Sequence, residues 1–98
     1  MTMEYVVTYD ISTESPDGVK RLRRVSQMCL NYGQRVQKSV FECRLDELGY
    51  AEFVRRMGEL IHPTEDSVRI YHVHRLHGSG VVSLGKDVGF DLDDPLIL

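Results

Sequence analysis

Residues 3–11 read Met3-Glu4-Tyr5-Val6-Val7-Thr8-Tyr9-Asp10-Ile11. β-Branched and aromatic residues favour a pleated strand, and no Gly or Pro interrupts the segment. We therefore expect a core strand that carries a carboxylate, Asp10, near its end. Burial of an unpaired charge is costly, so this acid is expected to be hydrogen-bonded, paired with a cation or bound to a metal.

A basic helix is expected to follow this strand, from about residue 16 to residue 32. Ser15 followed by Pro16 resembles an N-cap with proline in the first helical turn, and Gly33 suits the C′ position. The expected apolar stripe consists of Val19, Leu22, Val25, Cys29 and Tyr32. Four cations lie off the stripe, namely Lys20, Arg21, Arg23 and Arg24.

The rest of the chain predicts more strands and a second helix. Residues 35–45 read as extended, either as two short strands or as one bent strand. Asp46 is expected to cap a helix that ends near residue 61. Its inner face is expected to hold Tyr50, Val54, Met57 and Ile61. Residues 67–75 predict a further strand, and residues 81–84 predict an edge strand, on their own subunit or on a partner's.

The element order βαββαβ, with an additional C-terminal edge strand, is typical of an α+β ferredoxin-like fold. Residues 1–90 are expected to form one domain, followed by an acidic tail at residues 91–98. Apolar residues occur on both faces of the strands, whereas two helices can cover only one face. The other face is therefore expected to be buried in a homodimer, the alternative being an exposed β face.

The composition fits a single small domain with an uneven charge. The chain has 98 residues and a net charge of −3. Residues 1–45 carry seven Lys and Arg against five Asp and Glu, a net +2, and residues 46–98 carry five against ten, a net −5. A spanning helix needs roughly 20 apolar residues, and none of the stretches approaches that length. With no signal-peptide pattern, a cytoplasmic protein with reduced core thiols at Cys29 and Cys43 is expected.

Three other motifs are weak. Residues 80–87 have P-loop spacing, but Asp87 stands where Ser or Thr should bind magnesium, and too few residues follow. His72 and His74, with His77 nearby, have a spacing compatible with a metal, but no acid or cysteine completes the set, which favours surface or interface histidines. The strand around Phe41 has one aromatic residue and lacks the basic start of an RNA-recognition motif.

Asp10 beside the basic helix is a better candidate site. Magnesium prefers oxygen ligands and keeps several waters, so one carboxylate per subunit suffices when a dimer brings two together. Mg²⁺, or alternatively Mn²⁺, between paired Asp10 side chains could activate water and stabilise charge on a phosphate, with flanking arginines positioning the backbone. The alternatives are a helix cap or a salt bridge for Asp10 and a solvated face for the helix.

Three features together resemble the second CRISPR-associated protein family, the Cas-two proteins. They are Tyr9-Asp10-Ile11 at the end of the strand, the basic helix, and the string Gly33-Gln34-Arg35-Val36-Gln37-Lys38-Ser39-Val40-Phe41-Glu42. The resemblance covers roughly residues 3–86. With Ser83-Leu84-Gly85-Lys86 near its end, the compact chain resembles the branch of the family that accompanies subtype I-C interference systems.

The resemblance implies a homodimer in which a terminal strand completes the partner's sheet. It also implies a metal-dependent endonuclease that acts on RNA or double-stranded DNA and a subunit of the spacer-acquisition complex with the Cas-one integrase. The expected catalytic residues are Asp10, which also binds the metal, Tyr9 and Arg35. The expected nucleic-acid-binding residues are Lys20, Arg21, Arg23, Arg24, Arg35 and Phe41.

Two other functions remain open from the residues. One is a non-catalytic scaffold that clamps DNA for the partner integrase. The other is a ferredoxin-like regulatory module that binds a small ligand and no nucleic acid. The dependence of cleavage on Asp10 and the dependence of binding on salt separate the three.

Overall fold

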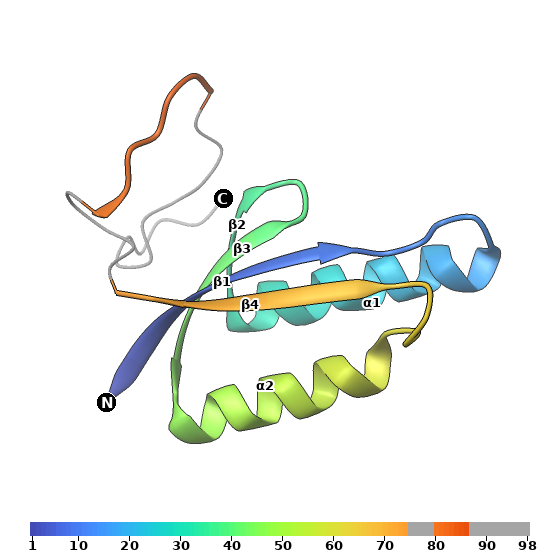
Figure 1. Ribbon diagram of the computed structural model, residues 1–98, viewed down its shortest axis with the longest axis horizontal. Coiled ribbons are helices and arrows are strands. Elements are labelled where there is room, and N and C mark those ends of the chain that lie inside the picture. Colours follow the sequence, from blue (N-terminus) through green and yellow to red (C-terminus); the bar gives the residue numbers. More distant parts are fainter. Residues whose placement is uncertain (75–79, 87–98) are drawn as a thin grey trace.

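The chain folds into a four-stranded sheet with two helices on one side of it (Figure 1). The computed structural model describes residues 1–74 and 80–86. In chain order, the elements are β1 (Thr2–Asp10), α1 (Pro16–Tyr32), β2 (Gly33–Gln37), β3 (Val40–Asp46), α2 (Glu47–Leu60) and β4 (Ser67–Val73). The sheet order is β2-β3-β1-β4 and every neighbouring pair is antiparallel. The predicted α+β ferredoxin-like order is confirmed.

Both helices begin at the side chains that the sequence predicts. The Ser15 hydroxyl accepts a hydrogen bond from the amide of Gly18 at 3.1 Å, and Pro16 occupies the first turn of α1. The Asp46 carboxylate accepts one from the amide of Gly49 at 2.7 Å. Each cap satisfies an amide that the first helical turn leaves without a partner.

Gly33 has a different role from the predicted one. Its backbone is extended, with φ −164° and ψ −156°, and it is the first residue of β2 rather than a left-handed C′ residue. A Cβ at this position would overlap the carbonyl oxygen of Glu42 and the Sγ of Cys43. Glycine is therefore required because β2 starts in close contact with β3.

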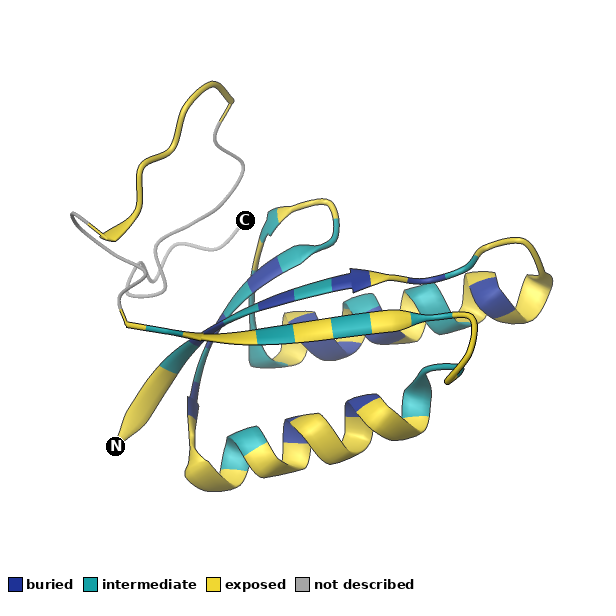
Figure 2. Ribbon diagram, in the orientation of Figure 1, coloured by how far each residue is buried: buried dark blue, intermediate teal, exposed yellow. Residues whose placement is uncertain are grey.

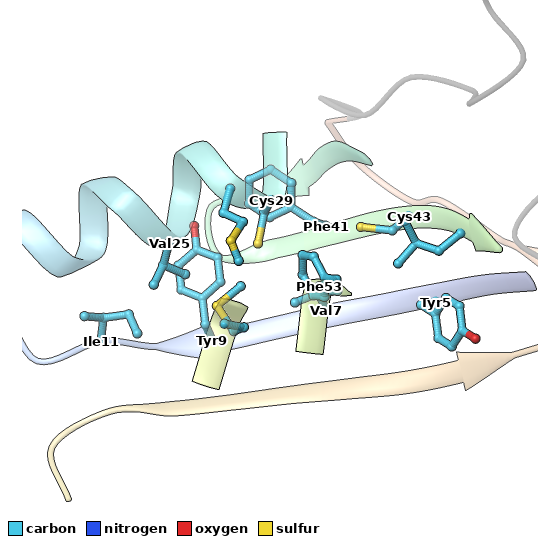
Figure 3. Close-up of a cluster of buried hydrophobic side chains, with 12 residues drawn as sticks. Tyr5, Val7, Tyr9, Ile11, Val25, Cys29, Phe41, Cys43 and Phe53 are labelled. Atoms are coloured by element: carbon cyan, nitrogen blue, oxygen red, sulfur yellow. The ribbon is translucent and has the colours of Figure 1, made fainter. Parts of the chain in front are cut away.

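The core lies between the sheet and the helices, where the buried positions gather (Figure 2). Strand residues alternate in burial, so that Tyr5, Val7 and Tyr9 of β1 point toward the helices. Figure 3 shows their side chains converging with those of the other buried residues. The remaining members are Ile11, Val25, Met28, Cys29, Phe41, Cys43, Leu45, Phe53 and Met57.

The inner faces of the helices differ at two positions from the expected ones. In α1, Met28 is buried whereas Val19 is exposed. In α2, Phe53 has 0% exposure whereas the neighbouring Val54 is 41% exposed. Phe53 and Val54 are adjacent and so lie about 100° apart on the helix, and the larger aromatic ring is the one that faces the sheet.

The predicted edge strand does not form within the described chain. β4 ends at Val73, and residues 81–84 are irregular, with Val82 and Leu84 strongly exposed. A strand needs a neighbouring edge for its hydrogen bonds, and none of the described strands pairs with this segment. His77 and residues 91–98, which carry the predicted acidic tail, lie outside the described residues.

Within the part of the chain that the structure describes, neither helix is long and apolar enough to cross a membrane.

The two cysteines are free and buried, as predicted. Burial raises the pKa of Cys29 to about 12, with a further contribution from Cys43. Burial also raises the pKa of Cys43 to about 11. Because the thiolate is the reactive form, both thiols are inert in the folded chain and serve as small apolar residues.

We expect Phe53→Ala to lower the free energy of unfolding by about 3–5 kcal/mol, because it empties a fully buried site. The adjacent Val54→Ala is the control and should change it by less than about 0.5 kcal/mol. Urea unfolding of both variants measures the difference. Equal losses would contradict the observed orientation of α2.

Candidate functional site

Asp10 lies on the face of the sheet that no helix covers. It is the last residue of β1 and is exposed, which corrects the expectation of an acid within a buried run. Because Tyr9 points toward the helices, strand alternation places the Asp10 side chain on the opposite face, together with those of Val6 and Thr8. We call this surface the open face. Across the ladder, Asp10 pairs with Ser67 of β4.

The Asp10 carboxylate has neither of the structural partners that the sequence left open. Ser15, and not Asp10, caps α1. Within residues 1–74 and 80–86, no ion pair joins Asp10 to Arg35 or to an arginine of α1. The described residues also contain no group of three or more His, Cys, Asp or Glu side chains that could hold a metal. Among the described residues, no side chain is recorded as binding the exposed Asp10 carboxylate.

Three other predicted site residues lie together, but on the helix side of the sheet. The Tyr9 hydroxyl lies 2.8 Å from the Ser26 Oγ of α1, and the Tyr9 ring stacks on that of Phe41 with centroids 6.0 Å apart. The Arg35 guanidinium carbon lies 5.0 Å from the Phe41 ring centroid, a cation–π contact. Figure 3 shows the Tyr9 hydroxyl directed toward α1.

This arrangement changes the roles expected for two of these residues. Phe41 has 0% exposure, so in this chain it packs the core and supports Arg35, and its expected contact with a nucleic acid stays a prediction. Tyr9 is buried, and its hydroxyl is on the other side of the sheet from the Asp10 carboxylate. One protomer therefore does not bring Tyr9 and Asp10 together at one reacting centre. Arg35, on the edge strand β2, is exposed.

The four cations of α1 fall into two groups. Lys20, Arg23 and Arg24 are exposed and form no ion pair within the described part of the chain. Arg21 has only 14% of its side chain exposed and is bound by two carboxylates, Asp66 at 2.7 Å and Glu65 at 3.2 Å. The charge of Arg21 is therefore already paired within the protein, whereas its expected contact with a nucleic acid stays a prediction.

Asp66 joins three segments of the chain. Its side chain is fully buried and accepts hydrogen bonds from the backbone amides of Ser12 at 3.1 Å and His62 at 2.7 Å. It also accepts two from Arg21, from Nε at 2.7 Å and from Nη2 at 3.4 Å. Burial alone would raise the pKa of this carboxyl. The Arg21 bond and the two amides outweigh burial and lower the pKa to about 2.

The position of Asp66 bears directly on Asp10. Ser12 is two residues beyond Asp10 along the chain, and Asp66 immediately precedes Ser67, the ladder partner of Asp10. The end of β1 is therefore held on both sides by one carboxylate. The sequence could not indicate this contact, because Arg21 and Asp66 are 45 residues apart and belong to no motif.

Arg69 is a second residue that the sequence did not single out. It pairs with Thr8 across the ladder and so lies on the open face, diagonally adjacent to Asp10. Its guanidinium carbon is 5.2 Å from the ring centroid of Tyr71, and within the described residues it forms no ion pair. The open face therefore carries a cation beside the free acid.

Comparison with known proteins adds to this geometry. Residues 3–76 match the family model described as CRISPR associated protein Cas2. The chain is 42% identical over 96 residues to the CRISPR-associated endoribonuclease Cas2 1 of Moorella thermoacetica, covering 98% of this chain and 100% of that protein. It is 43% identical over 95 residues to the CRISPR-associated endonuclease Cas2 of Halalkalibacterium halodurans, covering 97% and 99%.

Solved structures agree with the fold. The crystal structure of Streptococcus pyogenes Cas2 has a TM-score of 0.70 and 42% identity, covering 85% of this chain and 100% of that one. A hypothetical protein from Thermus thermophilus has a TM-score of 0.74 and 34% identity, covering 89% and 95%.

We expect Asp66→Ala to destabilise the fold by about 3 kcal/mol or more, because it leaves Arg21 and two amides without their buried partner. The control is Arg55→Ala, which breaks only exposed ion pairs and should cost less than about 1 kcal/mol. Urea unfolding near neutral pH measures both changes.

The stability lost in Asp66→Ala should also depend on pH. The pKa of Asp66 is about 2 in the folded chain, below its ordinary value of 3.8, so its contribution is complete above pH 3.8 and is lost as the pH falls toward 2. The stability difference between wild type and Asp66→Ala should therefore shrink over this interval. A difference that stays constant down to pH 2 would contradict the ionised pair.

Proposed function

The chain belongs to the CRISPR-associated protein Cas2 family, and from this premise we propose that it is an endonuclease whose phosphodiester cleavage depends on Asp10. The observation that supports the proposal is the exposed Asp10 carboxylate, which no described side chain binds. An acid that is neither a cap nor an ion-pair partner is available to a substrate or a cation. It also lies on the same face as a free cation, Arg69.

We further propose that the open face is covered by a second copy of the chain. Apolar side chains lie there on three adjacent strands, including Val6, Val40 and Tyr71, although no helix covers them. A two-fold interface uses the same patch on both protomers, so it can bring two Asp10 side chains toward one axis. The exposed segment 81–84 is suited to extend the partner's sheet, as the family resemblance implies.

One Asp10 side chain supplies only half of the carboxylate ligands that we propose for a divalent ion. Magnesium accepts a small number of carboxylates and keeps waters, so one Asp10 from each protomer would hold Mg²⁺, or alternatively Mn²⁺. When bound, the ion supplies an activated water and offsets charge on the scissile phosphate. The chain's own residues would do the rest: Asp10 would hold the ion, and Arg69, on the same face, would attract phosphate oxygens. Arg35 would attract phosphate oxygens only on the helix side of the sheet, and Tyr9 positions the strand end through Ser26.

The substrate class is a nucleic acid, bound through the exposed cations of α1, namely Lys20, Arg23 and Arg24. Arg21 contributes indirectly through its pairing with Asp66. One of the two relatives is named an endoribonuclease and the other an endonuclease, so RNA and double-stranded DNA are both candidate substrates here.

A scaffold in spacer acquisition, partnered by the Cas-one integrase, is the second candidate function. The observation that favours it is the separation of two surfaces. The free cations belong to a helix on one side of the sheet, whereas Asp10 lies on the other side. Duplex DNA could therefore be held on the helix layer without reaching the acid of the same protomer.

We also infer a position within the family near subtype I-C, on the residues Ser83-Leu84-Gly85-Lys86. Genes for I-C interference subunits beside this gene would support that placement, and genes of another subtype would overturn it.

Asp10→Asn should abolish Mg²⁺-dependent cleavage of single-stranded RNA and duplex DNA, with a loss of at least about 100-fold, because it removes the charge that holds the ion. Asp17→Asn, the same change at an exposed acid in the first turn of α1, is the matched control and should leave the rate unaltered. Cleavage by Asp10→Asn at the wild-type rate would refute the catalytic assignment. Spacer integration that persists in a cleavage-dead variant would favour the scaffold.

Tyr71→Asp should convert the dimer to a folded monomer, because it places a charge in the covered open face. Leu48→Asp, at an exposed apolar residue of α2, is the control and should remain dimeric. Light scattering should give twice the chain mass of 11.3 kDa for wild type and control, and 11.3 kDa for the variant. A wild-type protein that is monomeric at the concentrations used for cleavage would refute the shared site.

A further inference from the structure

A hollow of about 370 Å³ is lined by residues of α1 and α2. These helices lie on the side of the sheet away from the open face (Figure 1). We call this cavity the α1–α2 hollow. Its floor includes two apolar side chains, Met28 of α1 and Leu60 of α2. Its polar lining residues are Arg24, Gln27, Asn31, Arg56 and Glu59.

The polar groups of the hollow favour an anion. Arg24 forms no ion pair within the described residues, and the Arg56 Nη1 donates only to an uncharged group, the Tyr32 hydroxyl, at 3.3 Å. Glu59, the single acid of the lining, is already paired with Arg55 at 3.2 Å. Two guanidinium groups therefore contribute charge that no carboxylate of the described chain neutralises.

The amides add donors of the same kind. Gln27 Nε2 donates to Asn31 Oδ1 at 3.0 Å, an arrangement that leaves the Asn31 NH₂ group free to donate outward. Guanidinium forks and amide donors above an apolar floor match the oxygens of a phosphate better than they match an apolar or cationic ligand.

The spacing of the polar side chains along α1 favours a nucleic-acid strand as the ligand over a single phosphate ion. Lys20, Arg24, Gln27 and Asn31 follow one another at intervals of four, three and four residues, so they lie along one side of the helix. At 1.5 Å per residue this row is roughly 16 Å long. A nucleic-acid strand rises roughly 3.4 Å per nucleotide, so several phosphates fit along the row.

We propose that the α1–α2 hollow binds the phosphodiester backbone of a nucleic-acid strand, and that Arg56 of α2 is a binding residue together with Arg24. The proposal rests on the proposed nucleic-acid function and extends the binding surface from the cations of α1 to Arg56 of α2. Because the hollow and Asp10 belong to opposite sides of the sheet, a strand held here is not presented to the Asp10 of the same protomer. The contact in the hollow and the Asp10 centre therefore depend on different residues.

The test compares Arg56→Gln with Arg55→Gln in the full-length protein. These arginines are adjacent on α2 and both exposed, but Arg55 is paired with Glu52 and Glu59. Fluorescence anisotropy with a labelled 20-nucleotide RNA and a 20-base-pair DNA, in EDTA to prevent cleavage, gives the affinity between about 50 and 200 mM salt, the range over which phosphate contacts weaken. Thermal unfolding verifies that both variants are folded.

Arg56→Gln should weaken binding about 5- to 10-fold and reduce the slope of log K against log salt by about 0.9, the value for one lost phosphate contact. Arg24→Gln should do the same, and Arg55→Gln should match wild type. Free inorganic phosphate at up to 10 mM, about the scale of a weak single-ion site, should not displace the strand. Equal affinity and slope for Arg56→Gln and Arg55→Gln would overturn the proposal, as would displacement by that phosphate.

The outcomes separate this proposal from the nuclease assignment. If Asp10→Asn still cleaves but Arg56→Gln binds more weakly, the assignment of Asp10 fails and the hollow stands. If Asp10→Asn is inactive and Arg56→Gln binds like wild type, the hollow fails and the nuclease stands. A wild-type chain that binds neither nucleic acid at 50 mM salt would overturn both.

Discussion

The buried carboxylate of Asp66 is the contact on which much of the rest of the structure depends. It is bound by Arg21 of α1, by the amide of Ser12 after β1 and by the amide of His62 after α2. The Asp66 side chain has 0% exposure, so all of these bonds are made away from solvent. The bonds fix where α1 starts relative to the sheet, and they fix the end of β1, where Asp10 is exposed. A desolvated charge with all of its bonds made is costly to disturb, so this end of the fold is rigid.

Local patterns in the sequence predicted the elements well because their causes are local. Ser15 and Asp46 each satisfy an amide three residues ahead, and the alternation of Tyr5, Val7 and Tyr9 follows from the pleat of one strand. The contact between Arg21 and Asp66 could not be predicted, because it joins residues that only the tertiary fold brings together. The exchange of Phe53 for Val54 had a similar origin: both fit an apolar stripe, and packing against β3 and α1 chose between them.

The candidate site was predicted only in part, for a reason that lies in strand geometry. Tyr9 and Asp10 are neighbours in the sequence, yet alternation directs their side chains to opposite faces of the sheet. Tyr9, Phe41 and Arg35 form one connected group on the helix side, whereas Asp10 and Arg69 share the open face. The site residues predicted from the sequence were not assigned to faces of the sheet, so the prediction combined two surfaces that the structure separates. The edge strand predicted at residues 81–84 is a different case, since none of the described strands pairs with this segment.

The exposed Asp10 carboxylate, as half of a shared site, has a consequence for how nuclease activity would depend on the amount of protein in the cell. If two chains each supply half of one centre, the number of centres rises with the square of the chain concentration when the dimer is scarce, and only linearly when it is abundant. Nuclease activity would then be nearly silent while few copies exist and would appear steeply as expression rises. A potentially harmful activity could in this way be restrained by gene dosage alone, with no inhibitor required.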